Sequence, residues 1–519
     1  MTMVVLRRVA LLCVAGLLVG STSGALGAGA TVTGSAVTPL PAVQGPLATT
    51  ATSYPWGAAA HGLTPIDLAA HRYVEQEYLV SGRANVYSEG SGGPTVNASG
   101  PYETRILIRR PSDPGRFSGN VILELINPTS NYDVDIMWAA DHDHFMSRGD
   151  IYVGLSVKPV VLASMKTFDP GRYSGLSMAN PDPSQTCPQG STSTETGLAW
   201  DMISQVGALL RSGTAASPLA RLHVAHEYLT GYSQTGGYMI TYINDFAPHF
   251  TQASGSPIFD GYLIGAGYGF TELAPINQCA PPAVPGTPAD PVVPGVPQFV
   301  VHPPGNAPVI DVQTLSDSYS FFGWAGERPD GDTAGNKYRL YQVAGSSHIW
   351  TSQVDYTPGP ADLVRAGFPA NDWQDNCLEP NNPFPLEYQL NAAWDNLDQW
   401  VRAGIPAPHA PHISAVGDGT PAATILTDQY GNALGGVRSP AVDVPTATYY
   451  GTTAGPGTCT LLWGHWTPFS KAQLQQLYPS HNAYVQAVQS DVSSLRSGRW
   501  LTKEDAATIV SRAQSASIP

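Results

Sequence analysis

Charged side chains, and basic ones in particular, are scarce in this chain of 519 residues. Only 13% of the residues are charged, and 25 Lys and Arg stand against 40 Asp and Glu, which gives a formal net charge of −15. No stretch of the sequence gathers basic residues into a stripe that would offset this balance. Because such a surface repels a polyanion, the composition argues against a nucleic-acid partner.

Long apolar runs are also few. The run from Val9 to Gly20 follows the basic pair Arg7-Arg8 and precedes the small residues at 28–30. This order is typical of a signal peptide, so we predict that residues 1–30 are a targeting segment and that the mature protein is secreted or periplasmic. No other stretch approaches the ~20 apolar residues needed to cross a bilayer, and we expect no stable membrane insertion.

Cysteine is rare as well. Outside the targeting segment there are four: Cys187, Cys279, Cys377 and Cys459. An even number in an oxidising compartment favours two disulfides, and three pairings are possible. None of the four shows the C-x-x-C spacing of a zinc site, and we expect neither a metal nor an organic cofactor.

Glycine and proline are plentiful, with 53 and 46 residues, and 42% of the chain is hydrophobic. This composition is typical of a globular protein with many ordered loops. Residues 31–60 are rich in Ala, Thr, Gly and Pro, and we interpret them as a flexible lead-in with little capacity for a core. We expect residues 61–519 to form a single enlarged domain, while the oligomeric state stays open.

Short β-rich runs bounded by Gly, Pro, Asn or Ser alternate with helical patterns after residue 60. The expected strands are Tyr73–Tyr87, Tyr102–Arg109, Asn120–Ile126, Ile151–Val157, Glu227–Gly231, Gly261–Gly265, Pro308–Gln313 and Tyr338–Ala344. The expected helices are Asp133–Arg148, Thr196–Arg211, Gln234–Phe246 and a C-terminal tail of Lys471–Leu477, Ala483–Leu495 and Lys503–Ala513, the last capped by Thr502. Strands that alternate with helices predict an α/β fold with a mostly parallel central sheet and right-handed crossovers. Long irregular stretches near 158–195, 271–300 and 351–390 are predicted to be insertions such as lids or binding loops, and a second subdomain within them is the alternative.

One short segment carries the strongest chemical signal. Residues 231–236 read Gly-Tyr-Ser-Gln-Thr-Gly and join an expected strand to an expected helix. A serine on such a sharp turn presents its hydroxyl to a cleft, and the flanking glycines relieve crowding. Thr235 stands where the common G-x-S-x-G motif has its second glycine, so a purely structural turn is the competing interpretation.

The residues that follow favour Ser233 as a nucleophile. A serine hydroxyl needs a base, and the base needs a third group that holds it in the correct tautomer. In this strand–turn–helix context the chain order is Ser, acid, His, and the last two follow successive late strands. Asp317 and His348 occupy those two places, and we predict them as the acid and the base. Four other acids lie in the same region and remain alternatives to Asp317: Asp311, Glu327, Asp330 and Asp332.

The same chemistry needs backbone N–H groups that stabilise a developing oxyanion. One is expected from Gln234, directly after the serine, and another from the loop after Asn120–Ile126. That loop reads Asn-Pro-Thr-Ser at 127–130. Because Pro128 has no N–H to donate, Thr129 or Asn127 is the candidate.

These segments together resemble the large secreted bacterial proteins known as alpha/beta hydrolase domain-containing proteins, a branch of the α/β-hydrolase superfamily. The resemblance covers nearly all of the mature chain. It rests on Val121–Asn127, Gly231–Gly236, Pro308–Thr314 with Asp317, Val343–His348 and Pro468–Ser470. It implies the α/β-hydrolase fold, the triad Ser233, Asp317 and His348, and hydrolysis of carboxylic esters. It leaves open whether the substrate is a small or a polymeric ester, and which acyl and alcohol groups it carries.

Two other kinds of function remain possible. The same triad serves acyltransferases and peptidases, and a binding protein of the same fold could lack the chemistry altogether. The sequence Asp-His-Asp-His at 141–144 suggests a metal cluster. Because His142 and His144 would point about 200° apart on a helix, we interpret this segment as a solvated helix end.

Overall fold

The computed structural model describes residues 29, 31–32, 34–90, 92–184, 193–267, 275–277, 300–319, 326–372, 376–418 and 423–518. Nearly all of the predicted targeting segment 1–30, together with Cys187, Cys279 and most of the predicted insertion at 271–300, lies outside these ranges. Among the described residues, no helix combines the length and the apolar character needed to cross a membrane.

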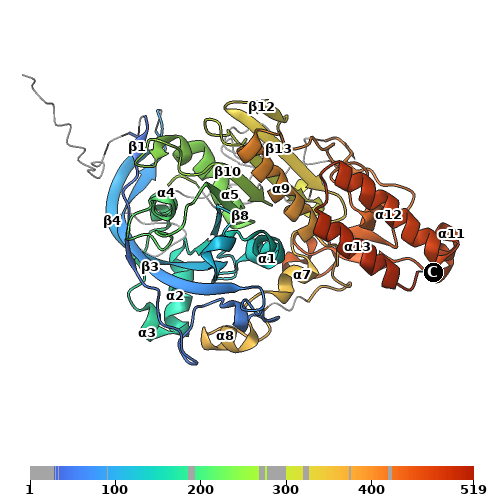
Figure 1. The fold of residues 1–519 in the computed structure, drawn as a ribbon, viewed down its shortest axis with the longest axis horizontal. Helices are drawn as coiled ribbons and strands as arrows, with labels where there is room; N and C mark the ends of the chain where they lie inside the picture. Colours follow the sequence, from blue (N-terminus) through green and yellow to red (C-terminus); the bar gives the residue numbers. More distant parts are fainter. Residues whose placement is uncertain are drawn as a thin grey trace, which may run out of the picture.

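A mixed sheet of 11 strands runs through the centre of the molecule (Figure 1). Its strands are β2 (Ala42–Gln44), β3 (Tyr73–Ser88), β4 (Thr95–Pro111), β5 (Asn120–Leu125), β6 (Ile151–Leu155), β7 (Ser177–Met178), β8 (His226–Tyr232), β10 (Gly261–Gly265), β11 (Val309–Thr314), β12 (Gly331–Thr333) and β13 (Asn336–Val343). They lie in the order β12-β13-β11-β10-β8-β5-β6-β4-β3-β2, and β7 pairs with β4. The strands from β13 to β6 are parallel, and the pairs at both edges are antiparallel. The predicted α/β fold with a mostly parallel sheet is confirmed.

The central strands are buried along most of their length because helices cover both faces of the sheet, and their residues are mainly apolar. All six residues of β5, Asn-Val-Ile-Leu-Glu-Leu, are buried, and so are all five of β6. The flanking helices are α1 (Ile136–Arg148), α4 (Ala199–Arg211), α5 (Gln234–Thr241) and α9 (Glu387–Ala403).

The direction of each crossover decides which face a helix covers. The step from β5 through α1 to β6 runs one way across the sheet, and the steps β6–α4–β8 and β8–α5–β10 run the other way. Right-handed crossovers therefore place α1 on one face, and α4 and α5 on the opposite face. The contacts agree with this arrangement, since α1 packs against α9, while the rings of Trp200 in α4 and Tyr238 in α5 lie 5.1 Å apart.

Shorter helices and strands lie outside the central sheet and its four flanking helices. They are the helices α2 (Pro159–Phe168), α3 (Pro170–Tyr173), α6 (Leu315–Tyr319), α7 (Thr351–Asp355), α8 (Pro360–Arg365) and α10 (Pro440–Asp443), and the strand pairs β1 (Ala36–Val37) with β9 (Phe250–Thr251), β14 (Ala415–Val416) with β15 (Thr424–Ile425), and β16 (Ala447–Tyr450) with β17 (His465–Pro468).

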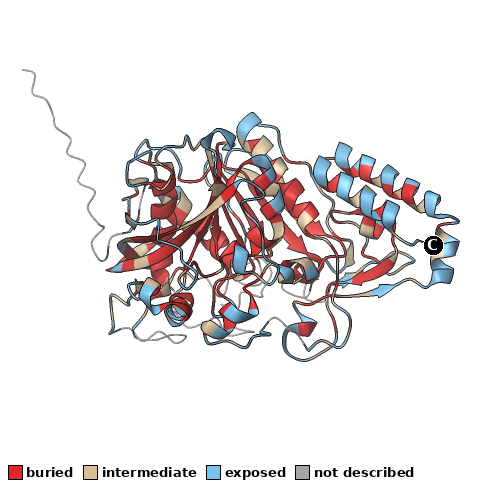
Figure 2. Ribbon diagram, turned by 60° about the horizontal axis from the view of Figure 1, so that its bottom comes forward, coloured by how far each residue is buried: buried red, intermediate tan, exposed pale blue. Residues whose placement is uncertain are grey.

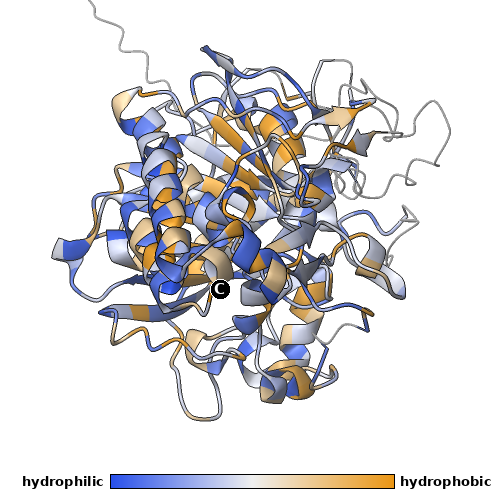
Figure 3. Cartoon of the chain, turned by 90° about the vertical axis from the view of Figure 1, so that its right-hand side faces the viewer, coloured by the Kyte–Doolittle hydropathy of each residue, from blue (hydrophilic) through white to orange (hydrophobic). Residues whose placement is uncertain are grey.

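The predicted helical tail is confirmed as α11 (Lys471–Leu477), α12 (His481–Ser497) and α13 (Lys503–Ser515). Thr502 caps α13, because its hydroxyl accepts the N–H of Asp505. Helices α12 and α13 bury apolar residues, including Val488 and Ala506, in a small core that also contains Tyr388 of α9, and α11 packs against it through the partly buried Leu474 and Leu477. Their outer turns are exposed, as the pale blue ribbon in Figure 2 and the alternating hydropathy in Figure 3 show.

The structure corrects the expectation for residues 31–60. This segment is not a simple lead-in, because β2 joins the main sheet beside β3 and the side chain of Trp56 is completely buried. The Trp56 indole N–H donates to the carbonyl of Asp133, and its backbone N–H donates to the Tyr173 hydroxyl. The composition hid this role, because the few large buried residues of the segment, such as Tyr54 and Trp56, stand among many small and polar ones.

Two further expectations were incomplete or wrong. Helix α9 begins inside the stretch 351–390 that was expected to be irregular, although Leu390, Ala393, Trp394 and Leu397 repeat at helical spacing. The segment 141–144 is not a solvated helix end: Asp141 and His142 are buried, and Asp141 accepts a hydrogen bond of 2.8 Å from the indole of Trp394.

The burial of Trp56 leads to a test of the corrected role of residues 31–60. We expect Trp56→Ala to lower the free energy of unfolding by about 3–5 kcal/mol, because a large buried side chain is lost and a cavity remains. Leu40→Ala is the matched control, since Leu40 is 43% exposed in the same segment, and it should change stability by less than about 0.5 kcal/mol. Equal effects of the two substitutions in urea unfolding would show that the segment is not part of the core.

Candidate active site

Ser233 sits on a strained turn between β8 and α5. Its backbone angles are φ 61° and ψ −123°, which side-chain-bearing residues rarely adopt. Such a conformation costs of the order of 1–3 kcal/mol and persists only where the surroundings enforce it. The turn places the serine at the carboxyl edge of the parallel strands.

The neighbouring glycines make this turn possible. A Cβ atom on Gly231 would lie 2.8 Å from the carbonyl oxygen of Thr235, and one on Gly236 would lie 2.6 Å from that of Gly265 at the end of β10. Thr235, which departs from the G-x-S-x-G motif, is accommodated because its hydroxyl donates to the Tyr232 carbonyl at 3.1 Å and accepts the Tyr232 N–H at 3.2 Å.

The three predicted residues come together at this edge. His348 Nε2 lies 2.9 Å from Ser233 Oγ, and His348 Nδ1 lies 2.6 Å from Asp317 Oδ1. An ionised carboxylate only accepts hydrogen bonds, so the imidazole proton belongs on Nδ1 and Nε2 is left to accept from the serine hydroxyl. All three side chains are at least 96% buried.

Asp317 is held by Thr314, three positions before it in the chain. Its second oxygen, Oδ2, accepts the backbone N–H of Thr314 at 3.0 Å and the Thr314 hydroxyl at 2.5 Å. Oδ1 is thereby directed to His348. This arrangement decides among the acids of the region, because it is Asp317 that contacts the imidazole.

The four alternative acids have other partners. Asp311 accepts from the Tyr338 hydroxyl at 3.0 Å. Asp330 and Asp332 lie beside Arg339, and Glu327 accepts from the side chain of Gln342.

The backbone of His348 is fixed by two side chains that sequence reasoning did not single out. The hydroxyl of Ser316 accepts the His348 N–H at 2.9 Å and donates to the carbonyl of Gly451 at 2.7 Å. The hydroxyl of Tyr232 donates to the His348 carbonyl at 2.9 Å. Burial, reinforced by the charge of Asp317, raises the pKa of Tyr232 well above its ordinary value and keeps this donor protonated. Ser316 directly precedes Asp317, and Tyr232 directly precedes Ser233. This adjacency is the sequence signal that could have identified them.

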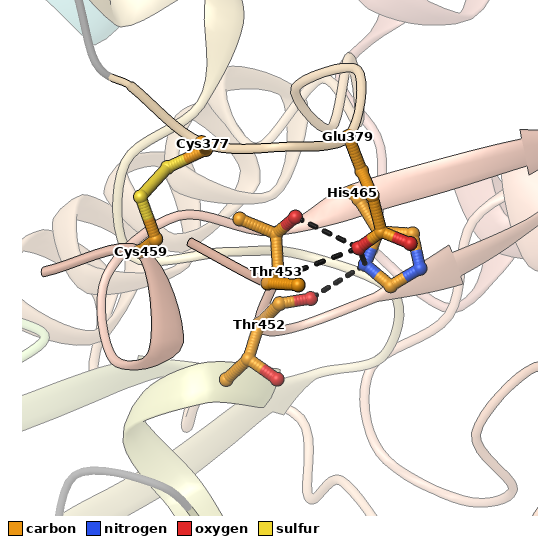
Figure 4. Close-up of a disulfide and its surroundings, with 7 residues drawn as sticks. Cys377, Glu379, Thr452, Thr453, Cys459 and His465 are labelled. Atoms are coloured by element: carbon orange, nitrogen blue, oxygen red, sulfur yellow. Dashed lines mark hydrogen bonds and ion pairs between the residues drawn. A yellow bond between two sulfur atoms is a disulfide. The ribbon is translucent and has the colours of Figure 1, made fainter. Parts of the chain in front are cut away.

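A C-terminal segment packs over the loop of His348. The N–H of Ile349 donates to Leu462 at 2.9 Å, and the side chain of Asn382 donates to the carbonyls of Gly345 and Tyr450. A disulfide between Cys377 and Cys459 closes this region, and the hydroxyl of Thr453 donates to Glu379 beside it (Figure 4). One of the two predicted disulfides is thus present, and the other cysteines lie outside the described residues.

The predicted oxyanion donors differ in whether the backbone N–H group already donates to an acceptor within the protein. Gln234 is the first residue of α5, where a helix leaves its N–H groups without an intrahelical partner. The N–H of Asn127 instead donates to the Val134 carbonyl at 3.1 Å, and that of Thr129 donates to Asn127 Oδ1 at 2.8 Å. Both predicted amides in this loop already have acceptors, so the expectation that either is open to a substrate is not met in this structure. The side chain of Asn127 also donates to the Tyr232 carbonyl at 2.9 Å and so ties the loop to the serine turn.

A family model described as an alpha/beta hydrolase domain matches residues 43–511. The chain belongs to this alpha/beta hydrolase family. The match spans every strand of the central sheet except the first residue of β2, and it includes Ser233, Asp317 and His348. A comparison with curated proteins finds no match.

Several solved alpha/beta hydrolase structures are also similar to this chain. An alpha-beta serine hydrolase homologue from Coxiella burnetii is 10% identical, with a TM-score of 0.26, over 54% of this chain and 95% of its own. A thermostable esterase from Pseudomonas putida is 11% identical, with a TM-score of 0.29, over 60% of this chain and 85% of its own. A serine hydrolase without a lid from Xanthomonas campestris is 13% identical, with a TM-score of 0.25, over 51% of this chain and 85% of its own. Because these sequence identities and TM-scores are low, the family assignment rests on the family match and not on these structures.

The disulfide beside the histidine loop leads to a stability prediction. Cys377 and Cys459 are 82 residues apart. In the chain-entropy model, a disulfide over that separation raises the free energy of the unfolded state by about 4.5 kcal/mol. We expect the double variant Cys377→Ser/Cys459→Ser to unfold at lower urea concentration, by up to this amount. An unchanged unfolding midpoint under non-reducing conditions would contradict the assigned disulfide.

Proposed function

We propose that this alpha/beta hydrolase is a serine-dependent enzyme that hydrolyses carboxylic esters through an acyl-enzyme intermediate. The observation that carries the proposal is the 2.9 Å approach of His348 Nε2 to Ser233 Oγ on a strained strand–turn–helix junction, with Asp317 behind the imidazole. The family match supports the hydrolase class.

The geometry supports a proposed role for each side chain. As the Ser233 hydroxyl attacks the ester carbonyl carbon, its proton passes to His348 Nε2, and Asp317 stabilises the imidazolium that forms. The same proton is then delivered to the leaving alcohol, which departs and leaves an acyl group on Ser233. Water, deprotonated by His348, attacks the acyl-enzyme and releases the acid, and Ser233 regains its proton. The Gln234 N–H, at the positive end of α5, is our candidate donor to the oxyanion.

We also propose that the enzyme acts outside the cytoplasm after removal of residues 1–30. The basic pair and apolar run at the N-terminus support export. The Cys377–Cys459 disulfide supports an oxidising compartment, because cytosolic conditions keep most thiols reduced. A small-molecule or polymeric ester is the proposed substrate, and no nucleic acid is expected to bind.

Ser233→Ala tests the nucleophile. We expect it to reduce kcat on p-nitrophenyl esters by about 10⁴-fold or more, because the alanine offers no atom that can form the acyl-enzyme. The assay is hydrolysis of a series from acetate to palmitate by the mature protein. Ser164→Ala is the matched control, since Ser164 is also buried but bonds only to the carbonyl of Val161 in α2. Full activity of the Ser233 variant would exclude the mechanism.

Ser316 is a positioning residue that can be tested separately. Loss of its hydroxyl frees the His348 N–H, and we expect Ser316→Ala to lower kcat about 10-fold, equivalent to ~1.4 kcal/mol, with little change in KM. Ser316→Thr, which keeps the hydroxyl, should recover part of the loss. Ser318→Ala is the control on the same helix, because the Ser318 hydroxyl bonds to Thr314 and Gln313 and does not touch His348. A purely structural role would lower the unfolding midpoint in both alanine variants and leave kcat of the folded protein unchanged.

A further inference from the structure

Three side chains with metal-binding groups meet outside the triad. Glu327 lies between α6 and β12, His412 precedes β14, and Asp418 follows it. One carboxylate oxygen or imidazole nitrogen from each lies within 4.8 Å of the other two. The separation between His412 Nδ1 and Glu327 Oε2 is 3.7 Å.

These separations are close to those of a metal site. Ligand atoms about 2.0–2.2 Å from a tetrahedral zinc ion lie roughly 3.3–3.6 Å from one another. The Glu327–His412 pair already has nearly this spacing, and the exposed Asp418, whose Oδ1 accepts the Tyr319 hydroxyl at 3.3 Å, completes the set. The set also contains an imidazole, which suits transition metals better than Ca²⁺ or Mg²⁺.

Glu327 is held in a fixed orientation. Gln342 of β13, which is fully buried, donates its Nε2 to Glu327 Oε1 at 2.5 Å and accepts the Ile413 N–H on its Oε1 at 2.8 Å. The amide therefore links the segment of Glu327 to the residue that follows His412. Oε2 of Glu327 is left facing the imidazole, as a metal ligand with an outer-shell partner would be.

The basic group that faces Glu327 is the imidazole of His412. Within the described ranges, no Lys or Arg forms an ion pair with Glu327. The adjacent cluster of Asp330, Asp332 and His409 differs, because Arg339 Nη2 lies 2.6 Å from Asp332 and Nε lies 3.8 Å from Asp330.

We propose that Glu327, His412 and Asp418 bind one divalent transition-metal ion, with Zn²⁺ as the preferred probe. The ion would tie the segment after α6 to the strand pair β14–β15. Tyr319, two residues after Asp317, already donates its hydroxyl to the Ile413 carbonyl at 2.8 Å, so the ion would reinforce the support of the acid loop. The site takes no part in the proposed bond-breaking steps and does not depend on them.

Equilibrium dialysis of the untagged, chelator-treated protein against Zn²⁺, with metal analysis by mass spectrometry, tests this proposal. We expect one zinc ion per chain and a rise in the thermal midpoint. His412→Ala and Glu327→Gln should each weaken binding by about 100-fold or more, since even outer-shell changes cost 10–100-fold. Ser233→Ala should bind zinc normally, which separates this result from any failure of the proposed hydrolase activity.

His409→Ala is the matched control, because His409 also lies beside two carboxylates, but these pair with Arg339. It should bind zinc as the unaltered protein does. The proposal is overturned if no zinc binds beyond the level of His412→Ala, if His409→Ala loses the ion equally, or if Ca²⁺ binds in preference to Zn²⁺.

Discussion

The parallel pairing of β8, β10, β11 and β13 is the constraint on which the candidate site depends. Each of these strands ends at the same edge of the sheet, so the loops after β8, β11 and β13 meet there although 115 residues separate Ser233 from His348. The register between β11 and β13 sets how the loops that follow these two strands lie relative to each other. Val343 lies opposite Thr314 at the ends of β13 and β11, which brings the loop of His348 over the first turn of α6 and onto Asp317.

This constraint brings the residues together but does not hold them at hydrogen-bonding distance. A surrounding set of hydroxyl groups does so: Thr314 is bonded to Asp317, and Ser316 and Tyr232 are bonded to the backbone of His348. Ser316 is bonded in turn to Gly451 at the end of β16. The C-terminal segment is thus more than a covering layer, because its hairpin, its disulfide and Asn382 fix the loop that presents the imidazole.

Much of this architecture could be read from the sequence. The central strands were predictable because they are short runs rich in β-branched and aromatic residues, bounded by turn residues. The tail helices were predictable because their apolar residues repeat at helical spacing. The predicted triad was inferred from chain order, because each of its members follows shortly after an expected strand. Asp317 could be separated from its neighbours only in three dimensions, where its contacts with Thr314 and His348 distinguish it.

Other features could not be predicted from the sequence, because they depend on contacts that form only in the folded chain. The anchoring of residues 31–60 depends on long-range contacts, such as those of Trp56 with Asp133 and Tyr173 and that of Tyr54 with Asp362, and no local sequence pattern predicts them. Which loop amides are open to a substrate depends on competing acceptors, and at Asn127 and Thr129 these acceptors belong to the loop itself. The cluster of Glu327, His412 and Asp418 joins residues up to 91 positions apart and has no sequence motif.

The most direct test of the account is to treat the mature protein with a fluorophosphonate probe and to locate the adduct by peptide mass spectrometry. Such a probe reacts with a serine only where a base activates the hydroxyl. The account predicts a single adduct, on Ser233, that disappears when His348 is replaced by alanine. No adduct, or one on a different serine, would contradict the assignment of Ser233 as the activated nucleophile.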